Sequence, residues 1–133
     1  MNTLDIFLQR LQILAAAKQE NLQNLFIQHG IVHMFQEQFE LGITLLQEAL
    51  REDGKGMEAM GSPKEIIMAA YEEYVFIEED VWLHMMQDCH RIPKKTTLKP
   101  VVMRILMHYI PALQQVAKAV SYTHLTLPTK RIV

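Results

Sequence analysis

Two pairs of polar side chains in this 133-residue chain have a spacing that could bind a metal ion. His84 and Asp88 stand four positions apart, which places both on one face of a helix. A protein metal site normally needs three or four convergent ligands, so a third ligand would have to come from another part of the fold. We therefore expect salt-linked or solvated surface residues here and no metal site. His29 and His33 share the spacing without an acidic residue between them, so the argument for a metal is weaker there.

A basic segment follows His84 and Asp88 along the chain. It contains Arg91, Lys94, Lys95 and Lys99. Such a segment can bind the phosphate groups of RNA or of a nucleotide. No aromatic residue is interleaved with these charges to stack against bases, so a solvated surface loop remains the alternative.

Nucleophilic catalysis has little support in the sequence. The chain contains two serines, and neither stands in the strand-turn-helix setting of a nucleophile elbow. Cys89 precedes His90, but adjacent residues of a helix point in different directions, so we expect a buried and inert thiol. The glycine patterns of phosphate-binding loops do not occur.

Helices must position all of these side chains. Apolar residues recur at spacings of three and four, which is the pattern of amphipathic helices. The pattern predicts long helices over about residues 4–22, 29–52, 79–90 and 98–118, and a short helix that begins after Ser62. Because no useful strand alternation occurs and the connections are short, we predict an all-α fold. It is an antiparallel up-and-down helical bundle of four long helices plus one short helix.

Local signals refine this prediction. Ser62-Pro63-Lys64-Glu65 combines an N-cap serine, a proline at the first helical position and the glutamate of a capping box. Pro111 falls inside the last predicted helix, where its missing N–H predicts a kink. The apolar stripes predict a buried core that includes Phe35, Phe39, Leu46, Trp82, Met85, Ile105 and Tyr109.

Length and composition indicate one domain. A chain of 133 residues has room for one hydrophobic core, and half of the residues are apolar. No apolar run approaches the roughly 18 residues that span a bilayer, and the N-terminus carries charges unlike a signal peptide. Together with the single cysteine, this favours the cytoplasm. The net charge of −2 gives no global indication of nucleic-acid binding.

The last residues of the chain differ in character from the rest. Residues 120–133 have neither helical periodicity nor a partner strand, and Ser121 to Leu125 match the translation of a transposon adapter used in sequencing libraries. We interpret residues 120–133 as an unstructured tail that is a sequencing-adapter artefact, and we set the domain at residues 1–119. A natural frayed tail is the alternative.

Two blocks of the sequence resemble the nucleotidyltransferase substrate-binding protein family. The first is Phe35-Gln-Glu-Gln-Phe-Glu-Leu41, where the family reads F-E-f-t-f-E-L. In the second block the residues shared with the family are Ser62, Pro63, Ala70, Ile77, Trp82, Met85 and Asp88. This ordered series of matches covers most of residues 4–115.

The resemblance implies a helical bundle that dimerises and associates with a separately encoded minimal nucleotidyltransferase. The two form a two-gene, toxin–antitoxin-like module within the wider HEPN superfamily. Ribonuclease toxins of that superfamily use an R-x(4–6)-H motif, but here Cys89 stands at the arginine position and Lys94 at the histidine position. The chain lacks the fixed cation and the proton-transfer group of the motif, so we expect no nuclease activity.

The leading hypothesis is therefore a non-catalytic substrate-binding or regulatory subunit. This subunit has no cofactor and forms a homodimer. Two alternatives stay open. One is a divergent HEPN ribonuclease that uses His90 with Arg91 or Lys94, and the other is an orphan structural bundle. Under the leading hypothesis, a polar cleft near residues 82–99 positions a substrate or docks the transferase. The residues that we expect to line this cleft are Trp82, Asp88, His90, Arg91, Lys94 and Lys95.

Overall fold

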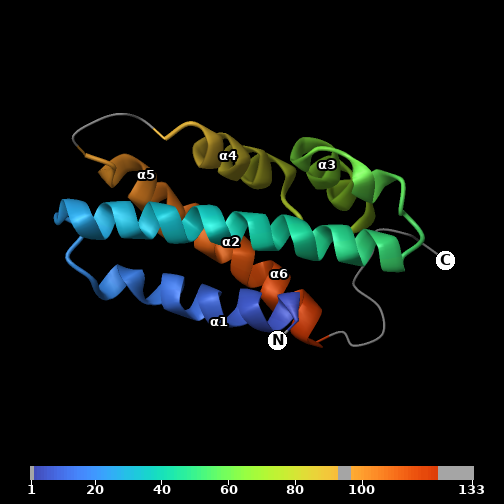
Figure 1. The fold of residues 1–133 in the computed structure, drawn as a ribbon, viewed down its shortest axis with the longest axis horizontal. Coiled ribbons are helices and arrows are strands. Elements are labelled where there is room, and N and C mark those ends of the chain that lie inside the picture. Colours follow the sequence, from blue (N-terminus) through green and yellow to red (C-terminus); the bar gives the residue numbers. More distant parts are fainter. Residues whose placement is uncertain (1, 93–96, 123–133) are drawn as a thin grey trace.

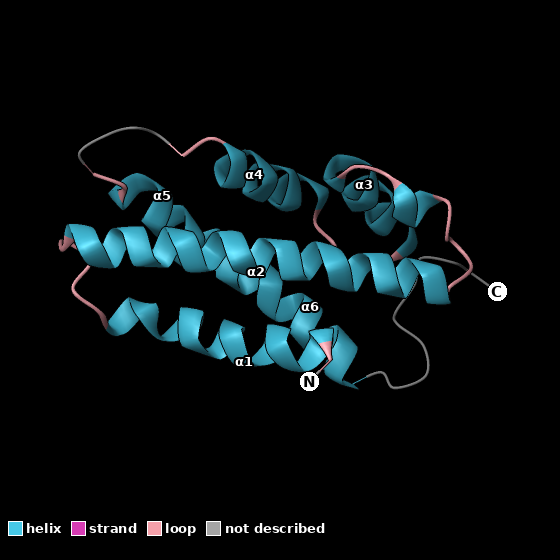
Figure 2. Cartoon of the chain, viewed as in Figure 1, coloured by secondary structure: helices cyan, strands magenta, loops and turns pink. Residues whose placement is uncertain are grey.

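The computed structural model describes residues 2–92 and 97–122, and its regular elements are all helical (Figures 1 and 2). This confirms the all-α prediction. The elements are α1 (Thr3–Ala15), a 3₁₀ turn (Ala16–Gln19), α2 (Leu25–Glu52), a 3₁₀ turn (Glu58–Met60), α3 (Pro63–Glu73), α4 (Glu79–His90), α5 (Lys99–Arg104), a π-helical turn (Ile105–Tyr109) and α6 (Ile110–Tyr122).

The long helix α2 forms the axis of the bundle. Figure 1 shows α1 running along one side of α2, while α3 and α4 follow one another along the other side. The continuous helix formed by α5, the π turn and α6, called the last helix below, contacts α2 and α4 with its first half and α1 with its second half. The short segments between consecutive helices fix this arrangement, because a short connection returns the chain beside the helix that it has just left. None of the helices in the described part of the chain is long and apolar enough to cross a membrane.

Side-chain caps set several helix ends. Ser62 Oγ accepts a hydrogen bond from the Glu65 backbone N–H, and Glu65 Oε1 accepts one from the Ser62 backbone N–H at 3.2 Å. This is the predicted capping box, with Pro63 at the first helical position. The α2 helix begins four residues earlier than predicted because the Asn24 side chain accepts hydrogen bonds from the N–H groups of Phe26 and Ile27.

The predicted irregularity near Pro111 takes the form of a π turn. The Ile110 N–H bonds to the Ile105 carbonyl, five residues back, instead of the usual four. Proline has no N–H, and its ring needs space next to the carbonyl four residues earlier. A widened turn immediately before Pro111 supplies that space.

The last helix runs past residue 119, where we set the end of the domain. It continues to Tyr122, and Val120 is partly buried against the core. The helix therefore includes the first three residues of the segment that we predicted as an unstructured tail. The rest of the proposed adapter-derived segment, residues 123–133, lies outside the described residues.

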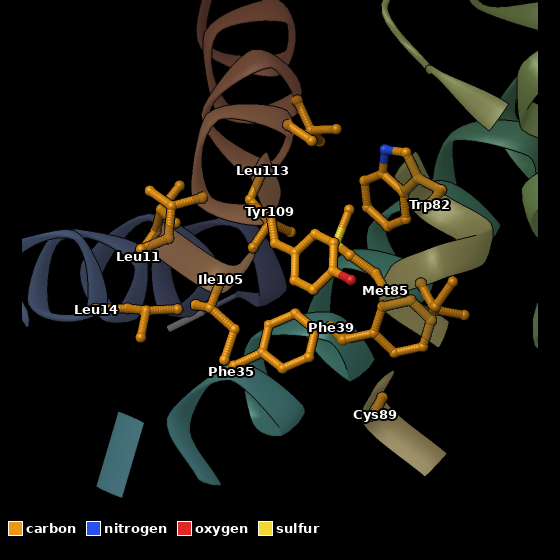
Figure 3. Packing of buried hydrophobic residues seen from close by; sticks show 14 of the residues in the cluster. Leu11, Leu14, Phe35, Phe39, Trp82, Met85, Cys89, Ile105, Tyr109 and Leu113 are labelled. Carbon is orange, nitrogen blue, oxygen red and sulfur yellow. The ribbon is translucent and has the colours of Figure 1, made fainter. Parts of the chain in front are cut away.

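The core agrees with the predicted apolar stripes. All seven side chains that we expected inside are buried. The Phe35 ring stacks on Tyr109 with ring centroids 5.2 Å apart, and Phe39 tilts against Trp82 at 6.2 Å. Figure 3 shows these rings gathered between α2, α4 and the last helix.

Close packing of Trp82 requires a glycine in the middle of α2. A β-carbon at Gly42 would lie 3.1 Å from Cη2 of Trp82, whereas a β-carbon at Gly30 would meet nothing within 4 Å. We expect Gly30→Ala to stabilise the fold by about 0.5–1 kcal/mol through helix propensity. Gly42→Ala should be less stable than Gly30→Ala, because the same gain is offset by displacement of the indole. Equal stabilisation of the two variants in urea unfolding would contradict this packing.

Candidate functional site

A groove of about 440 Å³ lies between α4 and the last helix. We call it the α4 groove. Polar and titratable side chains from both helices line it, with one aliphatic residue among them. The lining residues are Val81, His84, Asp88, Arg104, His108 and Tyr109.

The ion pair between Asp88 and Arg104, together with the Tyr109 hydroxyl, forms one wall of the α4 groove. Arg104 donates from Nε to Asp88 Oδ2 at 2.7 Å and from Nη2 to Asp88 Oδ1 at 3.0 Å. The Tyr109 hydroxyl donates to Asp88 Oδ2 as well. The stacking of the Tyr109 ring on Phe35 fixes this hydroxyl from the core side. The carboxylate of Asp88 therefore ties α4 to the last helix at two points.

These contacts shift the acid–base properties of the three groups. Burial alone raises the pKa of Asp88, but the hydrogen bonds from Arg104 and Tyr109 and the charge of Arg104 outweigh it, so that this pKa lies below its usual value. Burial and the hydrogen bond to Asp88 raise the pKa of the Tyr109 hydroxyl to about 12. The hydrogen bond to Asp88 raises the pKa of Arg104. At neutral pH the wall therefore holds a carboxylate, a guanidinium and a neutral phenol.

The Asp88 pKa predicts how stability depends on pH. Since its pKa is lower in the folded chain than in the unfolded chain, its contribution is fully present above the unfolded value and is lost as the pH falls through the folded value. We expect the difference in melting temperature between the native chain and Asp88→Asn to be largest near pH 7. It should shrink below about pH 4, where the unfolded carboxyl takes up a proton. A difference that stays constant from pH 7 to pH 2 would contradict this assignment.

Two histidines flank the ion pair. His84 Nδ1 lies 2.8 Å from the Asp80 carbonyl oxygen, which can only accept a hydrogen bond, so Nδ1 carries a proton. Nε2 of His84 then accepts a hydrogen bond when the ring is neutral and donates one when it is charged. His108 is exposed on the last helix and lines the same groove.

The structure places the six predicted cleft residues in different settings. Asp88 lines the α4 groove, in the salt-linked state that we expected for it. His90 and Arg91 are exposed at the end of α4 and are not among the residues that line the groove. Lys94 and Lys95 lie outside the described residues.

Trp82, which we expected to line the cleft, lies in the core and is not among the residues that line the α4 groove. Its side chain is 0 % exposed and packs in the core, so it cannot contact a ligand in the α4 groove. The indole Nε1 has no hydrogen-bond partner among the described residues. From the sequence alone, an aromatic residue among polar residues is equally compatible with a binding site and with the core. In this fold Trp82 is part of the core.

Sequence reasoning missed Arg104, His108 and Tyr109 as site residues. Arg104 and His108 stand four positions apart, the spacing that singled out His84 and Asp88. This repeated spacing was the available signal. Tyr109 gave no such signal, because it belongs to the apolar stripe of the last helix and is buried.

Cys89 is buried, as predicted. Its side chain is 6 % exposed, and burial together with the nearby charge of Glu40 raises its pKa to about 11. A thiol with this pKa stays protonated near neutral pH and is a poor nucleophile. An arginine at this position would place a guanidinium in the core of this chain.

Comparison with known proteins gives one family. The model of the family described as "Nucleotidyltransferase substrate binding protein like" matches residues 1–121. No curated protein and no solved structure matches the chain. The match extends from α1 to the next-to-last residue of α6 and therefore contains every residue that lines the α4 groove.

Proposed function

Because the chain belongs to the nucleotidyltransferase substrate binding protein like family, we propose that it is a non-catalytic substrate-binding or regulatory subunit of a minimal nucleotidyltransferase. The transferase is a separate chain, and the two form a toxin–antitoxin-like pair in the cytoplasm. The family match over residues 1–121 is the observation that carries this proposal.

The α4 groove is the substrate site in this proposal. Its volume of about 440 Å³ lies within the range of small-molecule sites, and its polar groups converge from two helices. Asp88 is ionised and held by Arg104 and Tyr109, so it is a poor proton donor near neutral pH. The Tyr109 hydroxyl holds its proton up to high pH. These two groups are therefore suited to positioning and not to proton transfer.

Exposed apolar side chains support association with a partner or with a second copy. Phe26 is 88 % exposed, Met57 86 % and Met60 80 %. Large apolar groups in water favour protein contacts that remove them from solvent. We propose that the subunit is a homodimer that also binds the transferase.

Co-expression with a minimal nucleotidyltransferase from the same genome, which we expect to be encoded next to its gene, tests the proposed function. We expect the two chains to copurify at a fixed ratio, and the rate of nucleotidyl transfer to change when the subunit is added to the isolated transferase. The chain alone should transfer no nucleotide. Failure to copurify, or an unchanged rate in a stable mixture, would overturn the proposal.

We expect the purified chain not to cleave RNA. The position of the motif arginine holds the buried Cys89, and the exposed His90 has no hydrogen bond to another described residue that would orient it as a base. The measurement is an RNA-cleavage assay without added metal, with His90→Ala as the control. Cleavage that disappears in His90→Ala would establish the divergent ribonuclease in place of the binding subunit.

A further inference from the structure

We propose that the α4 groove binds the phosphate group of a nucleotide-sized ligand through Arg104, His84 and His108. The inference rests on the proposed function, since it names the chemical class of the substrate that the groove takes. It begins from the charge of the lining. Arg104 is a cation, His84 and His108 each donate to a ligand from Nε2 when the ring is protonated, and the one carboxylate is already paired with Arg104.

Arg104 keeps hydrogen-bonding capacity for a ligand. A guanidinium has five N–H groups, and the Asp88 carboxylate accepts from two of them. The Arg104 side chain is 44 % exposed beside the groove, whereas Asp88 is 18 % exposed. The planar guanidinium matches the oxygen geometry of phosphate, so the remaining donors suit this group.

The contacts of Arg104 also fix the position of its guanidinium before a ligand binds. Asp88 bonds to it in a two-point arrangement, and Tyr109 holds Asp88 from the core. Because the guanidinium is already ordered, less side-chain entropy is lost when a ligand binds. His84 is restrained in the same way by its bond to the Asp80 carbonyl.

Two other grooves of the bundle lack this combination. One of about 270 Å³ contains Arg10, which is paired with Glu37 at 2.8 Å, and no histidine lines it. Another is lined by leucine, alanine and glutamine side chains without a charge. The α4 groove combines one arginine, two histidines and the aliphatic Val81 in a volume that admits a nucleoside monophosphate.

Titration calorimetry with adenosine 5′-monophosphate, inorganic phosphate and adenosine tests the inference. We expect the two phosphate compounds to bind and adenosine not to bind. Arg104→Gln should weaken binding of the monophosphate by about tenfold, because it removes a cation, and His108→Gln by about threefold, because it removes a ring nitrogen that can donate to the phosphate. Arg10→Gln removes an equally exposed, ion-paired arginine from another groove and should leave binding unchanged.

Asp88→Asn separates an anion site from a merely structural ion pair. Asparagine removes the negative charge next to the ligand but keeps an oxygen that can accept from Arg104, so that Arg104 stays ordered and monophosphate binding should tighten by about threefold to tenfold. A structural role alone predicts weaker binding for both Asp88→Asn and Arg104→Gln. His108→Gln keeps the test valid if Arg104→Gln fails to fold, because His108 is exposed.

The outcomes distinguish this inference from the proposed function. Equal binding of adenosine and its monophosphate, or unchanged binding in both His108→Gln and Arg104→Gln, would overturn the phosphate site. If phosphate binding fails while the transferase still copurifies, the inference alone is wrong. If the monophosphate binds as expected and no transferase copurifies, the phosphate site stands and the proposed function falls.

Discussion

Replacing Trp82 with alanine is expected to destabilise the bundle by about 3–5 kcal/mol. Its side chain is 0 % exposed and is the largest fully buried side chain of the described residues. The indole packs on Phe39 and against the backbone of α2 at Gly42, so truncation opens a cavity between α2 and α4. Helix α2 cannot close this cavity without losing its other contacts. Urea unfolding followed by circular dichroism measures the loss.

Two matched variants show whether this loss comes from packing. Trp82→Phe removes the indole N–H, which has no hydrogen-bond partner among the described residues, and keeps most of the ring volume, so it should cost much less than Trp82→Ala. His84→Ala, two positions further along α4 and exposed, should change stability by less than about 0.5 kcal/mol. A loss below about 1 kcal/mol for Trp82→Ala would show that Trp82 is not part of the core.

Replacing Gln28 with leucine is expected to cost about 2–4 kcal/mol, although leucine is apolar and similar in size. Gln28 is 3 % exposed and bonds both to the segment just before α2 and to the start of the last helix. Its Nε2 donates to the Leu22 carbonyl at 2.9 Å, and its Oε1 accepts from the Leu98 backbone N–H at 2.8 Å and from the Thr97 hydroxyl. Leucine would leave the Leu22 carbonyl and the Leu98 N–H without their hydrogen-bond partner. An unpaired buried polar group costs more free energy than a hydrogen bond contributes when it is formed.

Gln36→Leu provides the graded control for this effect. Gln36 is partly buried on the same helix and makes one hydrogen bond, from Nε2 to the Cys89 carbonyl at 2.9 Å. We expect it to cost about 1 kcal/mol. Thermal unfolding of both variants, beside the native chain, gives the comparison. An equal or larger loss for Gln36→Leu would show that the junction held by Gln28 does not carry the stability assigned to it.

The junction at Gln28 also bears on the α4 groove. Gln28 holds the start of the last helix, and Arg104 and Tyr109 lie further along that helix. If the start of the helix is released, the register of these two side chains against Asp88 is no longer held at that end. A Gln28→Leu variant that still folds should therefore bind a groove ligand weakly. A variant of equal stability whose substitution lies elsewhere in the core should bind the same ligand more tightly.

The sequence by itself determined the local structure. The spacing of apolar residues predicted the helices and the seven buried side chains, because an α-helix repeats every 3.6 residues and a helix beside a core must present one apolar face. The α3 start was predicted to the residue, since the Ser62 and Glu65 side chains satisfy backbone groups only three positions away. The two sequence blocks also indicated the family, which the match over residues 1–121 confirms.

Tertiary structure alone decided the site. Asp88 meets Arg104 and Tyr109 across 16 and 21 residues of chain, and their pairing depends on how α4 crosses the last helix. The spacing of residues within one helix does not determine the angle and position at which that helix crosses another. For the same reason Trp82 could be read as a cleft residue until its contacts with Phe39 and Gly42 placed it in the core. Local rules act over one helical turn, whereas a groove forms from side chains that only the packing of two helices brings together.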